Sequence, residues 1–74
     1  MYTVYFWKRA VNCPNATPCK TKADVNRVMI ELIDANKKAL QKAGYQRVGS
    51  VKEGLIQWRH PVYGVEESVR LKKD

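Results

Sequence analysis

The segment from Thr21 to Gly44 constrains the fold most, because its pattern predicts one amphipathic helix. Thr21 is placed as the N-cap, with Asp24 in the capping-box position three residues later, and Gly44 can supply a left-handed stop. Apolar residues recur at helical spacing on one face: Val25, Val28, Met29, Leu32, Leu40 and Ala43. Since one helix cannot bury its own apolar stripe in water, the flanking segments must provide a surface for it.

Those flanking segments alternate apolar and polar residues, as strands do. We predict four strands, over Tyr2 to Val11, Tyr45 to Val51, Leu55 to His60 and Val65 to Leu71. Tyr2, Val4 and Phe6 should face the helix, and Val65, Val69 and Leu71 should share one side of the last strand. Turns are expected at Lys52-Glu53-Gly54 and at Gly64, and residues 72–74 should fray. Where the first strand pairs stays open: parallel beside the second strand, or at an edge elsewhere.

The predicted order is therefore β-α-β-β-β, an α+β fold with one helix on one face of a small, mainly antiparallel sheet. Seventy-four residues make a single domain, residues 1–74. Asn12 to Lys20 should be an irregular loop, because two prolines and two asparagines oppose regular structure there. In the middle of the helix stripe, Asn36 replaces an apolar residue. It either satisfies a backbone group in the core or marks a gap that faces a partner, and we favour the first.

The net charge of +7 favours polyanionic partners, although it also serves solubility alone. Lys8, Arg9, Lys20 and Lys22 all precede the first acidic residue, Asp24. The sequence has no apolar run long enough for a membrane span and no signal-peptide pattern at its start. We therefore expect a cytoplasmic protein that does not bind membranes.

Few residues offer catalytic or metal chemistry. Cys13 and Cys19 both lie in the predicted loop. They can be reduced thiols, a disulfide or part of a metal site, and we favour reduced thiols. His60 is the only histidine, and no nucleophile motif surrounds a serine. Glu66 and Glu67 are neighbours on a predicted strand and should point to opposite faces. We therefore expect no enzyme, no cofactor and no metal.

With one helix, one face of the sheet should stay uncovered, and aromatic and basic residues are predicted on it. They are Tyr5, Trp7, Lys8, Arg9, Arg47, Trp58, Arg59 and Arg70. Aromatic rings can stack on bases while arginines neutralise phosphates, which predicts a nucleic-acid-binding face. Two alternatives remain: a protein-binding or homodimerising surface on the same face, in a protein encoded by a mobile element, or a second core with residues 12–20 folded over Trp7 and Trp58.

The run Leu40-Gln41-Lys42-Ala43-Gly44-Tyr45-Gln46-Arg47-Val48, followed by Arg59-His60-Pro61, resembles the hairpin of HicA-type mRNA-interferase toxins. That family has a double-stranded-RNA-binding-like α-β-β-β-α fold, and the likeness spans residues 40 to 64. Members of that family carry their catalytic histidine in a Gly-Ser-His segment, and the corresponding segment here is Gly54-Leu55-Ile56, which has no histidine. The N-terminal strand is extra, and no segment corresponds to the family's closing helix. The resemblance implies a related sheet and RNA binding without cleavage.

Overall fold

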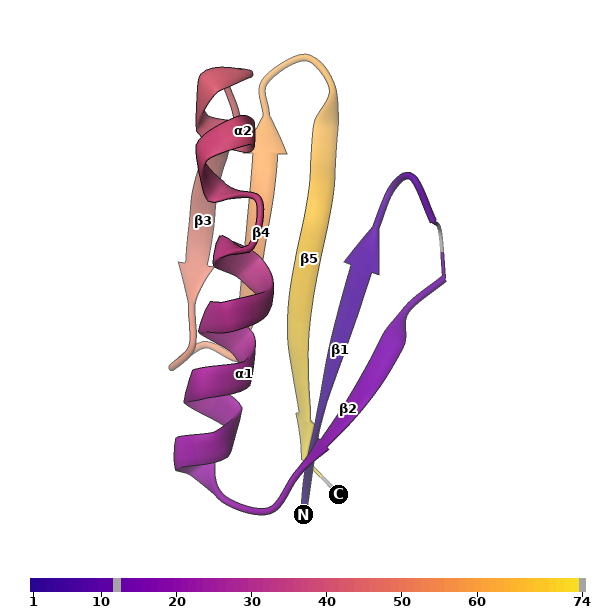
Figure 1. Cartoon of the computed structure of the whole chain (residues 1–74), viewed down its shortest axis with the longest axis vertical. Helices are drawn as coiled ribbons and strands as arrows, with labels where there is room; N and C mark the ends of the chain where they lie inside the picture. The colour runs from indigo at the N-terminus through magenta and orange to yellow at the C-terminus, as the bar shows by residue number, and fades with distance from the viewer. Residues whose placement is uncertain (12, 74) are drawn as a thin grey trace.

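A computed structural model describes residues 1–11 and 13–73, and these form a five-stranded antiparallel sheet with two helices on one face (Figure 1). The predicted α+β architecture is confirmed. The elements in chain order are β1 Tyr2–Lys8, β2 Asn15–Cys19, α1 Lys22–Asp34, α2 Lys37–Lys42, β3 Gln46–Ser50, β4 Leu55–His60 and β5 Gly64–Lys73. Asn12 of the predicted loop and Asp74 of the predicted tail lie outside the described residues.

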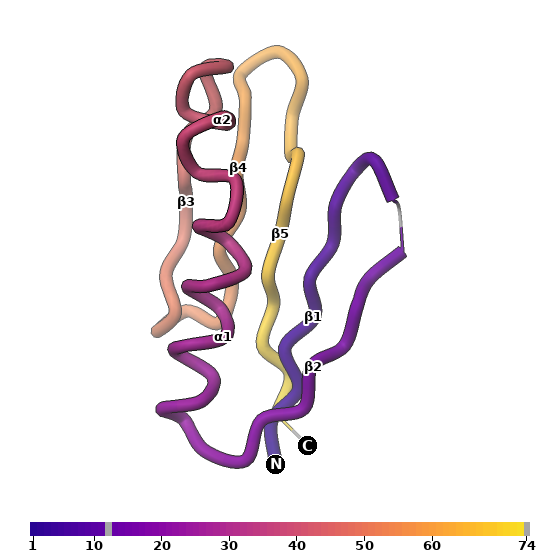
Figure 2. The backbone as a smooth tube through the Cα atoms, in the orientation of Figure 1, coloured from indigo at the N-terminus to yellow at the C-terminus, as the bar shows by residue number. Residues whose placement is uncertain are grey.

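The strand order β2-β1-β5-β4-β3 places the first strand inside the sheet rather than at an edge. β1 pairs antiparallel with β2 on one side and with β5 on the other. β3, β4 and β5 form the predicted antiparallel meander. The chain therefore leaves one edge at β2, passes through α1 and α2 across the sheet, and returns at the opposite edge in β3 (Figure 2). Because β1 pairs with residues 67–73 of β5, Lys72 and Lys73 belong to that strand, and their predicted fraying is wrong.

The prediction of an irregular loop over residues 12–20 is also wrong, because residues 15–19 form β2. Pro18 pairs with Thr3 inside this strand. β2 is an edge strand, and proline is tolerated there since its missing N–H can face solvent instead of a neighbouring strand. The proline at position 18 is therefore consistent with an edge position for β2.

The single predicted helix is two helices, with a break at Ala35 and Asn36. α1 begins as expected, since the Thr21 side chain accepts a hydrogen bond from the backbone N–H of Asp24 at 3.2 Å. At the break, the Nδ2 of Asn36 donates to Oε2 of Glu67 in β5 at 3.0 Å. Asn36 thus interrupts the apolar stripe to satisfy a polar group of the strand layer, here a side chain rather than a backbone atom.

The core lies between the helices and one face of the sheet. Val4 and Phe6 face the helices as predicted, and Tyr2 packs against the same cluster. The buried apolar residues are Val4, Phe6, Cys19, Val25, Met29, Ile33, Leu40, Ile56, Trp58 and Val69. Both layers contribute to this list, so the amphipathic helices and the alternating strands stabilise each other by removing apolar surface from water.

A β-bulge in β5 changes the direction in which the Val65 and Glu66 side chains point. Trp58 pairs with Glu67 but the next residue, Arg59, pairs with Val65, so Glu66 is an extra residue. Val65 consequently lies on the opposite side from Val69, against our prediction. Glu66 and Glu67, predicted on opposite faces, both reach the helical layer. They accept hydrogen bonds from Tyr45 and Asn36, which flank α2.

Two glycines with positive φ should respond differently to alanine substitution. Gly49 has φ +90°, and a Cβ there would overlap the carbonyl oxygen of Leu55. Gly64 has φ +80°, but its Cβ would meet nothing closer than Arg9 Nη2 at 3.5 Å. We expect Gly64→Ala to lower the free energy of unfolding by about 1 kcal/mol and Gly49→Ala by about 2 to 4 kcal/mol. Urea denaturation of both variants measures the difference, and equal losses would contradict it.

Candidate nucleic-acid interface

The sheet face turned away from α1 and α2, here called the open face, is formed mainly by β1, β4 and β5. Residues paired across neighbouring strands lie on the same face. Trp7 pairs with Ser68, which pairs with Gln57 on the other side, and Tyr5 pairs with Arg70. Every second residue along each strand points to the same side, and these residues together define the open face. They are Thr3, Tyr5, Trp7, Leu55, Gln57, Arg59, Val65, Ser68, Arg70 and Lys72.

The charges on this face have one sign. It carries Arg59, Arg70 and Lys72, all exposed. The carboxylates of the described residues lie elsewhere, on α1, in the turn after β3, or on the helical side of β5: Asp24, Glu31, Asp34, Glu53, Glu66 and Glu67. Within the described part of the chain, the open face therefore presents cations without a neighbouring acidic side chain, and its field attracts anions.

A hollow of about 730 Å³ lies on the open face. Trp7 and Tyr5, both partly buried, provide aromatic walls, and Pro14 contributes from the β1–β2 connection. The Gln57 and Ser68 side chains and the Arg70 guanidinium line the same space. The hollow thus combines flat apolar surfaces, neutral hydrogen-bonding groups and a positive charge, which suits a planar group attached to an anion.

Trp58 does not belong to this face, and its predicted placement there is wrong. Its side chain is 1% exposed, and its Nε1 donates to the backbone oxygen of Ile33 at 2.6 Å. Ile33 lies in the last turn of α1, where carbonyl groups lack partners within the helix. Trp58 also shares the alternation of Ile56, which is completely buried. The indole therefore fills the core beneath the helix break and satisfies the end of α1.

Two of the predicted basic residues also lie on the helical side. Arg47 pairs with Trp58 across β3 and β4, and its Nη1 binds Oδ1 of Asp34 at 2.9 Å. Lys8 pairs with Glu67, and its Nζ lies 4.0 Å from the Oε2 of that carboxylate. Both cations are thus matched with acidic residues of the helical side and do not contribute to the open face.

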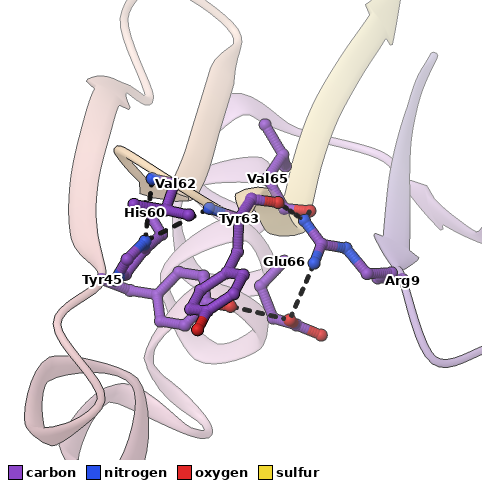
Figure 3. Close-up of polar contacts among 7 residues, drawn as sticks. All are labelled: Arg9, Tyr45, His60, Val62, Tyr63, Val65 and Glu66. Carbon is purple, nitrogen blue, oxygen red and sulfur yellow. Dashed lines mark hydrogen bonds and ion pairs between the residues drawn. The ribbon is translucent and has the colours of Figure 1, made fainter.

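Arg9 contacts the turn of the hairpin formed by β4 and β5 (Figure 3). Its Nη2 donates to the carbonyl oxygens of Tyr63 and Val65, the latter at 2.9 Å, and its Nη1 lies 4.0 Å from Glu66 Oε1. These contacts join β1 to the far end of the hairpin. Arg9 therefore has a structural role that the sequence did not indicate, since its partners are backbone carbonyls 54 and 56 residues away.

His60 is also part of the hairpin, as Figure 3 shows. Its Nδ1 accepts hydrogen bonds from the backbone N–H groups of Val62 at 3.0 Å and Tyr63 at 3.2 Å. Nδ1 acts as the acceptor in both hydrogen bonds. The ring lies between Tyr45 and Tyr63, at centroid distances of 5.1 and 4.6 Å. The imidazole therefore stabilises the turn between β4 and β5 through its hydrogen bonds to the backbone.

Partial burial raises the pKa of Tyr45, and the hydrogen bond and negative charge of Glu66 raise it further. A folded-state pKa above the unfolded value of about 10 contributes stability that is fully present below pH 10 and is lost as the pH rises through the folded pKa. When the pH is raised from 9 to 11, we therefore expect the free energy of unfolding to fall less for Tyr45→Phe than for the native chain. Urea midpoints at several pH values test this, and parallel pH profiles would contradict it.

The cysteines are free thiols, with Cys13 exposed and Cys19 buried. Cys13 lines a small hollow beside Phe6 and Lys8, whereas Cys19 pairs with Tyr2 at the other end of the β1–β2 hairpin. Phe6 and Tyr2 are four residue steps apart along an extended strand, about 13 Å, so cysteines beside them are too far apart for a disulfide. Among the described residues, no three His, Cys, Asp or Glu side chains gather as metal ligands would.

Comparison with protein-family models, curated proteins and solved structures found no match to this chain. In the part of the chain that the structure describes, neither helix has the length and apolar character required to cross a membrane.

Proposed function

We propose that the protein is a non-enzymatic module that binds single-stranded nucleic acid on its open face. The observation that carries the proposal is the hollow in which Tyr5 and Trp7 lie beside Arg70, on a face that has no acidic side chain among the described residues. In this role Tyr5 and Trp7 stack on bases, and Arg59, Arg70 and Lys72 neutralise phosphates. The resemblance of residues 40 to 64 to HicA-type toxins points to the same class of ligand.

The combination of rings and cations favours a single strand over other polyanions. Stacking of a base on an aromatic side chain contributes about 1 to 3 kcal/mol, and it requires a base free of its own neighbours. In a duplex the base faces are already stacked inside the helix, so Tyr5 and Trp7 could not reach them. An acidic protein would use the cations but gain little from a planar aromatic hollow. The open face therefore suits splayed bases joined by phosphates.

Tryptophan fluorescence tests the proposal directly, because the two indoles have different environments. Trp7 lies on the open face, whereas Trp58 is in the core. We expect mixed-sequence single-stranded RNA at low salt to quench the native fluorescence in a saturable way, and added salt to reverse the effect. Trp7→Phe should abolish most of the quenching, since only Trp58 would remain.

An unchanged signal at all RNA and single-stranded DNA concentrations would contradict the proposal. Sedimentation in the same buffers identifies the other use of the face. Self-association that tolerates salt and is lost in Trp7→Ala would show a homodimer surface instead, because apolar contacts are less sensitive to ionic strength than phosphate contacts.

A further inference from the structure

Two neutral polar side chains stand beside Trp7 on the open face. Trp7, Ser68 and Gln57 form one row across β1, β5 and β4, with neighbouring strands about 4.8 Å apart. Gln57 and Ser68 are partly buried and line the hollow. No hydrogen bond joins the Gln57 amide or the Ser68 hydroxyl to another residue that the structure describes. The row therefore offers an aromatic wall and, next to it, available hydrogen-bonding groups.

We infer that this row is a nucleobase site in which Trp7 stacks on the base while Gln57 recognises its edge, with adenine preferred. The inference rests on the proposed function. A base lying over Trp7 extends along the row past Ser68 and reaches the longer Gln57 side chain. The carboxamide presents a donor and an acceptor side by side, which match the N6 amino group and the N7 of adenine.

The composition of the row disfavours the other bases. Guanine presents two acceptors, O6 and N7, on the corresponding edge and is best bound by the paired donors of an arginine. Arg59 and Arg70 lie in the rows on either side, about 6.7 Å from Gln57 and Ser68 along β4 and β5. There they can meet the phosphates before and after the stacked base. Pyrimidines are smaller than purines and cover less of the indole, so they gain less from stacking.

Equilibrium binding of short adenine, cytosine and uracil oligonucleotides of equal length tests the inference. For the native chain we expect affinity for the adenine oligomer about tenfold above the others, the size of effect that one bidentate amide contact provides. Gln57→Leu should remove most of this preference, because it should weaken binding of the adenine oligomer about tenfold and binding of the cytosine and uracil oligomers much less. Gln41→Leu, the same substitution on α2, is the matched control and should keep the preference.

Gln57→Met, which keeps an unbranched side chain, gives a second variant if the leucine variant is poorly folded. Equal affinity of the native chain for all three oligomers would overturn the inference, and so would an adenine preference that survives in a folded Gln57 variant. These outcomes differ from a failure of the proposed function, in which the native chain binds none of the oligomers.

Discussion

Replacing Trp58 by alanine should leave the protein largely unfolded at 25 °C. The side chain is 1% exposed and belongs to the largest fully buried residues, and its Nε1 bonds the Ile33 carbonyl at the end of α1. Removing a buried tryptophan typically lowers the free energy of unfolding by about 3 to 5 kcal/mol. A small domain has little more than about 5 kcal/mol in total, so this loss approaches its whole stability.

Circular dichroism and the dispersion of amide proton resonances measure the outcome. Trp7→Ala is the matched control, because Trp7 is only partly buried, and this variant should remain folded. A cooperative, native-like unfolding transition in Trp58→Ala would mean that the indole does not support the core. Such a result would favour the position on the open face that the sequence predicted for Trp58.

The second large effect concerns the charges of the open face. We expect the triple variant Arg59→Gln, Arg70→Gln, Lys72→Gln to bind single-stranded RNA at least about tenfold more weakly than the native chain at low salt. Each phosphate contact with a single strand contributes about 0.7 to the slope of log affinity against log salt concentration. Loss of three contacts should therefore reduce the magnitude of that slope by about 2.

The chain offers a control with the same change of net charge. Lys37, Lys38 and Lys42 are exposed on α2, in the helical layer opposite the open face. Their replacement by glutamine also removes three positive charges, yet should change the affinity and the salt slope far less. Equal weakening by the two triple variants would show that total charge, and not the open face, governs binding.

The sequence predicted the fold class because its strongest signals are local. The Thr21 cap, the apolar spacing of the helix and the glycine turns at Gly44, Gly54 and Gly64 all appear in the structure. The meander over residues 46–73 follows from short turns between alternating strands. The pairing of β1 with β5 could not be derived, because it depends on which edge the returning strand reaches, a non-local choice with no local signal.

The composition of the candidate site was predicted in part. Tyr5, Trp7, Arg59 and Arg70 lie on the open face as expected. Trp58 could have been placed correctly, since adjacent strand residues point to opposite faces and Arg59 was already assigned outward. The position of Arg9 could not be predicted, because its partners are backbone carbonyls of the β4–β5 hairpin, which are distant in sequence.

Charge pairing and strand irregularity account for the other differences. Arg47 and Lys8 are on the helical side because the cross-strand register sets their alternation, and nothing in a single strand reveals that register. The bulge at Glu66 changes the alternation within β5 and separates Val65 from Val69. Pro14, which lines the hollow, directly precedes β2, a strand that the sequence did not predict.

Titration of the ¹⁵N-labelled native chain with a single-stranded RNA, followed by amide and indole NMR shifts, measures directly whether the open face binds nucleic acid. We expect saturable shifts concentrated on the open face, at Trp7, Gln57, Ser68 and Arg70, while the shifts of α1 amides such as those of Arg27 and Glu31 do not change. Shifts centred on the helices, or none at RNA concentrations that saturate other single-strand-binding domains, would contradict this expectation.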